Sequence, residues 1–191
     1  MGCASCKKMQ VYREEDIVAQ LQDPAKQREA FSCVVKLYGE RLYWQIRKMV
    51  LSHEDTNDIL QNTFLKAWAN IDLFRGDAKL STWLYKIAIN ESLTFLKKQR
   101  QMNHVSIDDT DVFLLDRLKG DEYFNGDEAQ MKLQKAILTL PEKQRLVFHM
   151  KYYEEMKYEE MSEILGTSVG ALKASYHYAV KKIEEFLTKE L

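Results

Sequence analysis

Polar side chains gather on one face of a helix that the sequence predicts over about residues 81–100. Successive residues of a helix are about 100° apart around its axis, so the side chains of Lys86, Asn90 and Lys97 project within about 40° of one another. The opposite side of this helix carries an apolar stripe of Leu84, Ile87, Ala88 and Phe95. The helix is therefore expected to pack by one face and to present two lysines around one amide on the other. An ordinary solvated helix face has the same pattern.

A helix-turn-helix pattern runs from Tyr158 to about Leu187. The pattern predicts a short helix over 158–165, a stop at Gly166, and an N-cap at Thr167 or Ser168. In the second helix, the inward stripe comprises Leu172, Tyr176, Ala179 and Ile183. The outward side chains are small, polar or cationic, which suits a helix in the DNA major groove: Lys173, Ala174, Ser175, His177, Tyr178 and Lys181. A helical hairpin that closes a bundle is the alternative interpretation.

The sequence patterns of enzymes and metal sites are missing. The chain has no phosphate-binding loop, dinucleotide fingerprint, HExxH or nucleophile elbow. Cys3 and Cys6 form a single CxxC without a second pair, and the four histidines lack metal ligands at suitable spacing. We therefore expect no catalytic residue, no metal site and no cofactor, in a protein that is not an enzyme.

The elements that carry these residues are expected to be helices. Seven glycines and two prolines in 191 residues are too few for the frequent turns of a β-sandwich or barrel. With 46% hydrophobic and 30% charged residues, the chain can form a core and is not disordered along its length. Apolar periodicity predicts helices at about residues 14–22, 25–51, 55–70, 81–100, 128–138, 141–153, 158–165 and 168–187. The third of these carries an apolar side of Leu60, Phe64, Ala67 and Trp68. Ser81 or Thr82 is the expected N-cap of the fourth helix.

The charge is unevenly distributed along the chain. Residues 1–104 carry 16 Lys and Arg against 12 Asp and Glu, residues 105–128 carry 2 against 8, and residues 129–191 carry 10 against 9. The net charges are therefore +4, −6 and +1, which sum to the −1 of the whole chain. The chain therefore has two neutral-to-basic blocks joined by an acidic connector, which indicates a polyanionic partner for the blocks and a positively charged destination for the connector. A connector that is only a solvated linker is the alternative interpretation. No segment has the apolar length of a membrane span or a signal peptide, so we expect a cytoplasmic protein without membrane insertion.

Three blocks of sequence resemble the extracytoplasmic-function (group four) sigma factors of bacterial RNA polymerase, within the sigma-70 family. The blocks are Asp58–Trp68, Phe74–Asn90, and Leu140–Phe148 with Tyr158–Lys173, and the resemblance covers about residues 25–101 and 129–188. It implies an N-terminal tail and short helix over 1–24, sigma domain two over 25–104, an acidic linker over 105–128 and sigma domain four over 129–191. The implied fold class is all-α, with two small helical domains joined by an acidic flexible linker, the C-terminal one a helix-turn-helix domain.

The resemblance also implies a function and its partners. The chain would bind core RNA polymerase, through the clamp helices of the largest subunit and the flap of the second subunit. It would recognise the −35 and −10 elements of promoter DNA and promote DNA melting for transcription initiation. An inhibitory anti-sigma factor is a further implied partner, and the acidic linker would thread the RNA-exit path.

The resemblance also implies site residues, which are assigned by their positions in the family pattern. The polymerase-binding set comprises Asp58, Gln61, Phe64 and Trp68. The −10 set comprises Phe74, Arg75, Gly76, Asp77, Lys79, Ser81, Lys86, Asn90 and Lys97. The −35 set comprises Ser168, Lys173, Ser175, His177, Tyr178 and Lys181. The chain departs from the family pattern at Glu155, where a glycine is usual, and at Ser175 and Tyr178, where arginines are common.

Two other functions are weighed against this one. A stand-alone helix-turn-helix regulator that binds duplex operators would need neither the Asp58–Trp68 block nor the Phe74–Asn90 block. A helical adaptor that binds only proteins would fit the near-neutral net charge. It would not need the base-facing loop and helix.

Overall fold

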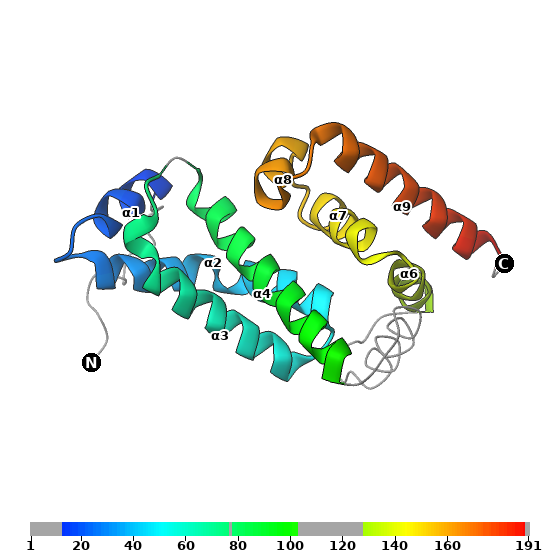
Figure 1. Cartoon of the computed structure of the whole chain (residues 1–191), viewed down its shortest axis with the longest axis horizontal. Helices are drawn as coiled ribbons and strands as arrows, with labels where there is room; N and C mark the ends of the chain where they lie inside the picture. The colour runs from blue at the N-terminus through cyan, green and yellow to red at the C-terminus, as the bar shows by residue number, and fades with distance from the viewer. Residues whose placement is uncertain (1–12, 77, 103–127, 190–191) are drawn as a thin grey trace.

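The computed structural model describes residues 13–76, 78–102 and 128–189, which fold into helices without a strand (Figure 1). The helices are α1 (Glu14–Leu21), α2 (Gln27–Val50), α3 (His53–Ala69), a short 3-10 helix (Ile71–Leu73), α4 (Leu80–Met102), α6 (Glu128–Leu138), α7 (Glu142–Tyr152), α8 (Tyr158–Leu165) and α9 (Val169–Lys189). The all-α fold class is confirmed. Nearly all of the acidic linker, as well as Cys3 and Cys6, lies outside the described residues.

Helices α1 to α4 form one packed group. The buried stripe of α2 follows the predicted spacing of three and four residues: Val34, Tyr38, Leu42, Ile46 and Met49. In α3 the buried stripe differs from the prediction, because Thr56 and Thr63 are fully buried while Trp68 is exposed. The hydroxyl of Thr63 donates to the Ile59 carbonyl at 2.7 Å, and that of Thr56 donates to the Ser52 carbonyl. A threonine that bonds its own helix in this way loses no hydrogen bond on burial.

The start of α4 also differs from the prediction. The helix begins at Leu80, so Ser81 and Thr82 lie inside its first turn and neither is its N-cap. The carboxylate of Glu14, in α1, accepts a hydrogen bond from the backbone N–H of Leu80. A side chain from a distant helix therefore satisfies a free N–H that a local serine or threonine was expected to satisfy.

Helices α6 to α9 form a second group, with a small core of its own in which α6 and α7 pack against α9. The predicted helix-turn-helix is confirmed in detail. Gly166 ends α8 with a left-handed φ of 62°, and the Ser168 hydroxyl accepts from the Ala171 N–H at 3.3 Å as the cap of α9. Leu172, Ala179 and Ile183 are buried as expected.

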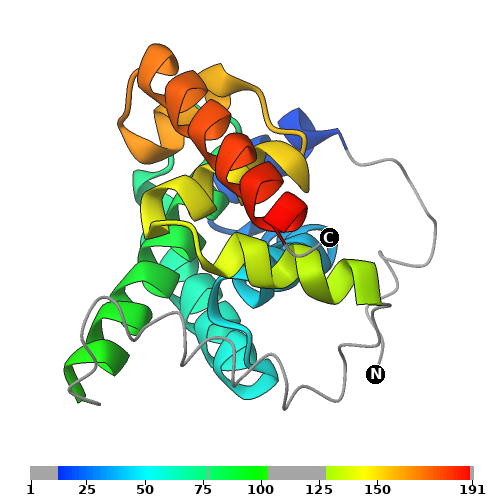
Figure 2. The same cartoon turned by 90° about the vertical axis from the view of Figure 1, so that its right-hand side faces the viewer.

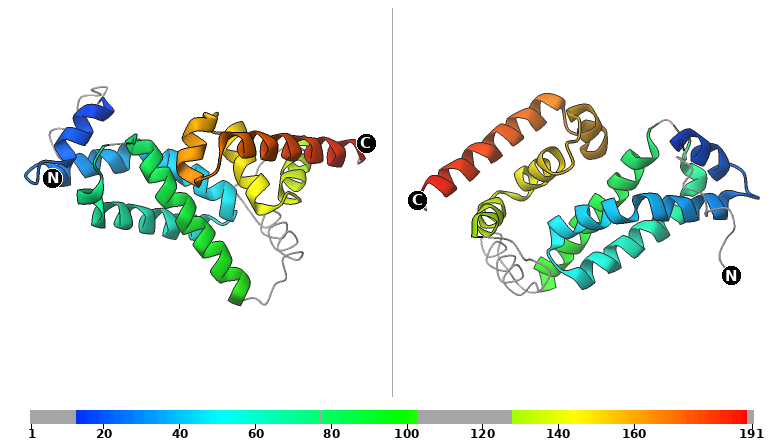
Figure 3. Two further views of the ribbon diagram at one scale, coloured as in Figure 1. Left: turned by 45° about the horizontal axis from the view of Figure 1, so that its top comes forward. Right: turned by 180° about the vertical axis from the view of Figure 1, so that it is seen from behind.

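The two groups pack against each other, with α8 on α4 and α7 on α2 (Figures 1 and 3). A single buried cluster extends from α2 and α4 into α7 and α8. Helix α4 consequently has a second buried face, with Tyr85, Ile89 and Leu96, beside the predicted stripe. Helix α9 of the second group lies at the opposite side of the molecule from α3 (Figures 1 and 2).

Candidate polymerase and nucleic-acid interfaces

The exposed face of α3 carries most of the predicted polymerase-binding residues. Asp58, Gln61 and Trp68 are exposed there. Phe64 is half-buried, and the Phe31 ring of α2 packs edge-on against it at 6.3 Å and against Trp68 at 5.0 Å. Leu65, which was not predicted, is 58% exposed between these residues. Its spacing of four from Gln61 and seven from Asp58 was the signal that could have identified it.

The loop between α3 and α4 is held by an aromatic pair. Phe74 is buried, and its ring lies against Trp83 with centroids 5.0 Å apart. Phe74 therefore anchors the loop in this conformation and is not available on its surface. Arg75, Gly76 and Lys79 of the −10 set are exposed. Asp77 lies outside the described residues.

Two further features of this loop bear on its surface. Gly76 has a φ of 80°, a backbone conformation that favours glycine. Leu73, which was not predicted, is 73% exposed immediately before Phe74. An exposed leucine next to a buried phenylalanine leaves an apolar side chain beside the cations of the loop.

The polar face of α4 lies where the sequence predicts it. Lys86, Asn90 and Lys97 are all exposed. Among the described residues, none of their side chains has a hydrogen bond or an ion pair that holds it to the protein. Ser81, in the first turn of the same helix, is half-buried. The face is therefore free to bind a ligand along three turns of the helix.

Lys79, in contrast, is already paired. Its Nζ donates to Glu160 of α8 at 2.7 Å. This hydrogen bond raises the pKa of Lys79 and lowers the pKa of Glu160, so each group favours its charged form. One residue of the −10 set is thus bonded to the helix-turn-helix group.

The −35 set lies on and before α9. Lys173, His177, Tyr178 and Lys181 are exposed, and Ser175 is half-buried. Ser168 is exposed but serves as the helix cap. Lys173 lies over the ring of Tyr158 in α8, 5.7 Å from its centroid. Because α9 is 21 residues long and its outer face is open, it can enter a groove without a rearrangement of the helix itself.

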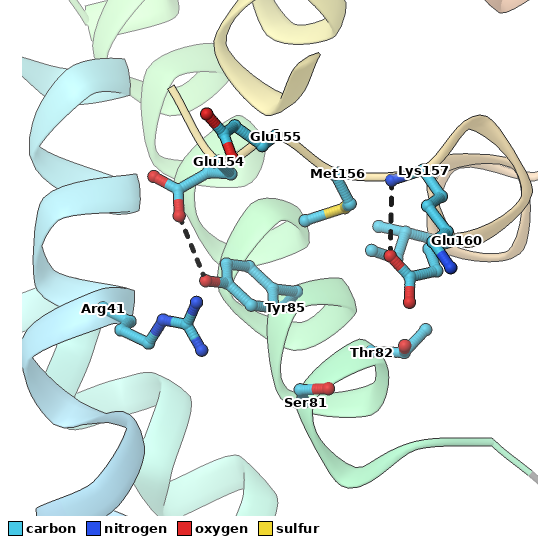
Figure 4. Close-up of a pocket in the computed structure, with 10 residues that line it drawn as sticks. Arg41, Ser81, Thr82, Tyr85, Glu154, Glu155, Met156, Lys157 and Glu160 are labelled. Atoms are coloured by element: carbon cyan, nitrogen blue, oxygen red, sulfur yellow. Dashed lines mark hydrogen bonds between the residues drawn. The ribbon is translucent and has the colours of Figure 1, made fainter. Parts of the chain in front are cut away.

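A pocket of about 250 Å³ lies between the two helix groups (Figure 4). Its lining comprises Arg41 of α2, residues 81, 82 and 85 of α4, and residues 154–157, 160 and 164. Glu154 accepts hydrogen bonds from Lys48 at 2.9 Å and from the Tyr85 hydroxyl at 3.4 Å. Burial, together with the charge of Glu154, raises the pKa of Tyr85 to about 12. The Tyr85 hydroxyl is therefore a hydrogen-bond donor at any physiological pH.

Among the described residues, no group of three or more His, Cys, Asp or Glu side chains is placed to hold a metal ion. None of the helices in the described part of the chain is long and apolar enough to cross a membrane.

Two family models match the chain. The model described as "Sigma-70 region 2" matches residues 34–102, and the model described as "Sigma-70, region 4" matches residues 130–183. The first range contains α3, the loop and α4, and the second contains α8, the turn and most of α9.

Curated relatives and solved structures agree with these matches. The ECF RNA polymerase sigma factor SigW of Bacillus subtilis (strain 168) is 30% identical over 158 residues, which cover 78% of this chain and 84% of that protein. The RNA polymerase sigma-H factor of Pseudomonas aeruginosa is 26% identical, with 92% and 94% of the two chains covered. The sigma factor RpoE of Bartonella quintana, solved with the anti-sigma factor NepR, has a TM-score of 0.63 at 22% identity, over 83% of this chain and 96% of that one. CnrH, solved with the cytosolic domain of CnrY, has a TM-score of 0.67 at 22% identity, over 93% and 99%. The chain belongs to the extracytoplasmic-function sigma factors of the sigma-70 family.

Proposed function

We propose that three separate surfaces of this sigma factor each bind a different partner. As a member of this family, the chain is a promoter-recognition subunit of RNA polymerase and is not an enzyme. The α3 face would bind polymerase, the loop with the polar face of α4 would bind the −10 element, and α9 would bind the −35 element. The observation that carries the proposal is that all three predicted sets have exposed members, and that the sets lie on different parts of the fold.

The α3 surface has the composition of a protein-binding site. Leu65 and Trp68 expose apolar area beside Asp58 and Gln61. Exposed apolar residues rimmed by polar ones are typical of protein interaction sites. We propose that this face binds the clamp helices of the largest polymerase subunit and that domain four binds the flap of the second subunit.

The loop and α4 have the chemistry that an unpaired base and its strand require. A base that leaves the duplex needs hydrogen-bond donors and acceptors at its edge, and the released strand needs cations along its backbone. Asn90 supplies an amide, and Lys86 and Lys97 lie one turn before it and two turns after it. We propose that Asn90 reads the base while the lysines bind phosphates.

The α9 surface carries few positive charges for a helix that binds DNA. Its outward residues include two lysines and no arginine: Lys173, Ser175, His177, Tyr178 and Lys181. A helix with few cations gains little from phosphate contacts. We therefore propose that it binds the −35 element only as part of the polymerase holoenzyme, where the other surfaces contribute to binding.

Regulation and location follow from the family. The structural neighbours RpoE and CnrH were solved with the anti-sigma factor NepR and with the cytosolic domain of CnrY. We propose that an anti-sigma factor also binds this chain, and that the chain acts in the cytoplasm, where RNA polymerase and promoter DNA are found.

Co-purification with core polymerase followed by run-off transcription tests the proposal. A sigma factor directs promoter-specific transcripts that core polymerase alone does not make. A stand-alone operator-binding regulator would instead bind its duplex tightly without polymerase, and it would have no use for exposed Leu65 and Trp68 on α3.

A further inference from the structure

Leu73, at the end of the short 3-10 helix, is the most exposed large apolar side chain among the described residues. It is 73% exposed, compared with 71% for Met102 and 58% for Leu65. A single exposed leucine is common on protein surfaces and needs no explanation by itself. Leu73 differs from such a residue in its position, because it lies inside the loop that is proposed to bind the −10 element.

The local fold holds Leu73 on the outside of this loop. Residues three apart lie on the same side of a 3-10 helix, and Ile71 and Phe74 are both buried. Asp72, between them, accepts a hydrogen bond at 2.9 Å from the side-chain amide of Gln27 in α2. The turn is therefore fixed by its neighbours, and it presents Leu73 to solvent without a rearrangement.

The aromatic residues near Leu73 are not available for the same contact. Phe74 is 7% exposed, and its ring lies 5.0 Å from that of Trp83, which is half-buried. Among the described residues from 70 to 83, Leu73 is the one large apolar side chain that is exposed. An apolar contact between this loop and a ligand therefore falls to Leu73, although the sequence indicated Phe74.

The surroundings of Leu73 suit DNA better than they suit a protein. A protein-binding site exposes several apolar side chains together, as α3 does with Leu65 and Trp68. The loop exposes one, and Arg75, two residues further on, is exposed without a hydrogen bond or an ion pair among the described residues. Proteins that unstack DNA insert a single apolar side chain such as leucine between base steps, and basic residues nearby bind the DNA around it.

We infer that Leu73 is a wedge in promoter opening, which fills the place in the base stack that an extruded base of the −10 element leaves. Its apolar contact replaces part of the stacking that is lost when the base pair breaks. It therefore stabilises the opened DNA and has no counterpart in the closed duplex. This inference rests on the proposed function, because it assigns to Leu73 one step of the melting at the −10 element.

Promoter opening by the reconstituted holoenzyme tests the wedge on two templates. One is a duplex promoter that the wild-type holoenzyme transcribes, and the other is the same promoter with mismatched, unpaired strands across the −10 element. The test variant is Leu73→Ala, and the matched control is Leu37→Ala, which shortens a leucine that is 50% exposed on α2. Permanganate reactivity of the −10 thymines measures opening, and run-off transcription measures the product.

Leu73→Ala should reduce opening of the duplex promoter about tenfold, because most of an apolar side chain that becomes buried is lost. On the mismatched template the strands are already apart, so its transcript yield should stay close to that of the control. Leu73→Met, which keeps the apolar bulk, should open the duplex as the wild type does. Leu73→Asn, which is similar in size but polar, should fail as Leu73→Ala does.

Circular dichroism and co-purification with core polymerase provide the controls for these variants. Because Leu73 is exposed, each variant should keep its helix content and its yield of polymerase complex. Duplex opening by Leu73→Ala at the level of the control would overturn the wedge, and so would an equal loss on both templates. Weaker association with core polymerase would also overturn it and would place Leu73 in a protein interface. If the wild type itself gives no promoter-specific transcript from either template, the proposed function is wrong and the wedge falls with it.

Discussion

Glu14 and Leu80 lie 66 residues apart in the chain, yet the Glu14 carboxylate accepts a hydrogen bond from the Leu80 backbone N–H. The other carboxylate oxygen of Glu14 accepts from the Tyr38 hydroxyl at 3.2 Å. One side chain of α1 therefore joins the start of α4 to the middle of α2. This contact fixes the end of the loop that carries the proposed −10 residues.

Replacing Glu14 with alanine should lower the free energy of unfolding by about 1–2 kcal/mol, because an N-cap and a second hydrogen bond are lost. Urea unfolding followed by circular dichroism measures the change. Glu15→Ala is the matched control, since Glu15 is exposed in the same turn and should change stability by less than about 0.5 kcal/mol. A Glu14→Ala variant as stable as the control would show that the contact contributes nothing.

His149 should make the stability of the protein fall as the pH is lowered below about 6.5. Burial, together with the smaller effect of the charges of Arg145 and Lys48, lowers the pKa of His149 to about 3. Above pH 6.5 the imidazole is neutral in both the folded and the unfolded chain and has no effect. Between pH 6.5 and 3 only the unfolded chain binds the proton, so protonation favours unfolding.

The expected loss from His149 is about 2 kcal/mol between pH 7 and pH 5. The variant His149→Leu has no group that titrates there, and it should lose correspondingly less stability over this interval. Urea unfolding of the two proteins at both pH values gives the comparison. Identical losses in the wild type and the variant would mean that His149 is protonated in the folded protein.

Glu155 adopts a left-handed backbone, with a φ of 51°. The conformation costs a residue other than glycine about 1–3 kcal/mol, whereas glycine adds about 0.5–1 kcal/mol of backbone entropy to the unfolded chain. Glu155→Gly should therefore stabilise the protein by about 1 kcal/mol in thermal or urea unfolding. Glu163→Gly, in the middle of α8, is the control and should destabilise by a similar amount. A loss of stability in Glu155→Gly would refute the argument from strain.

Asn90→Ala should change promoter preference without changing stability. Asn90 is exposed on α4, so its truncation opens no cavity and alters stability by less than about 0.5 kcal/mol. A bidentate contact to a base edge carries about 1–3 kcal/mol of discrimination, roughly five- to a hundredfold. Run-off transcription from promoters randomised across the −10 element should show relaxed preference at one position. Lys86→Ala and Lys97→Ala, as phosphate contacts, should weaken all promoters alike. If Asn90→Ala instead reduces transcription equally from all promoters, the base is read by the loop alone.

Local features of the fold could be predicted from the sequence, and long-range ones could not. The bounds of α6 and α8 and the cap of α9 depend on neighbours within a few residues, and Gly166, Ser168 and the apolar periodicity predicted them. The cap of α4 depends on Glu14, and periodicity carries no information about a partner so distant in sequence. The buried threonines of α3 were missed because a polar residue was taken to indicate an exposed position.

The same limit applies to the candidate sites. The polar faces of α4 and α9 were predictable because each lies on a single helix. The pairing of Lys79 with Glu160 and the burial of Tyr85 and Ile89 result from contact between the two helix groups. An amphipathic pattern identifies the packed face of a helix only where other helices cover one side of it. Helix α4 is covered on two sides.

Run-off transcription with reconstituted core polymerase tests most directly the claim that this chain confers promoter specificity through α3. The wild type should direct transcripts from its own promoters, and Gln61→Ala with Leu65→Ala should lose both polymerase association and transcription while keeping its helix content and unfolding free energy. Leu37→Ala, at an exposed leucine of α2, is the control and should behave as the wild type. Without polymerase, the free protein should bind promoter duplex only at the non-specific level of about 10⁻⁴–10⁻⁶ M at physiological salt. Nanomolar, sequence-specific binding by the free protein, or wild-type polymerase association by the α3 variant, would contradict this account.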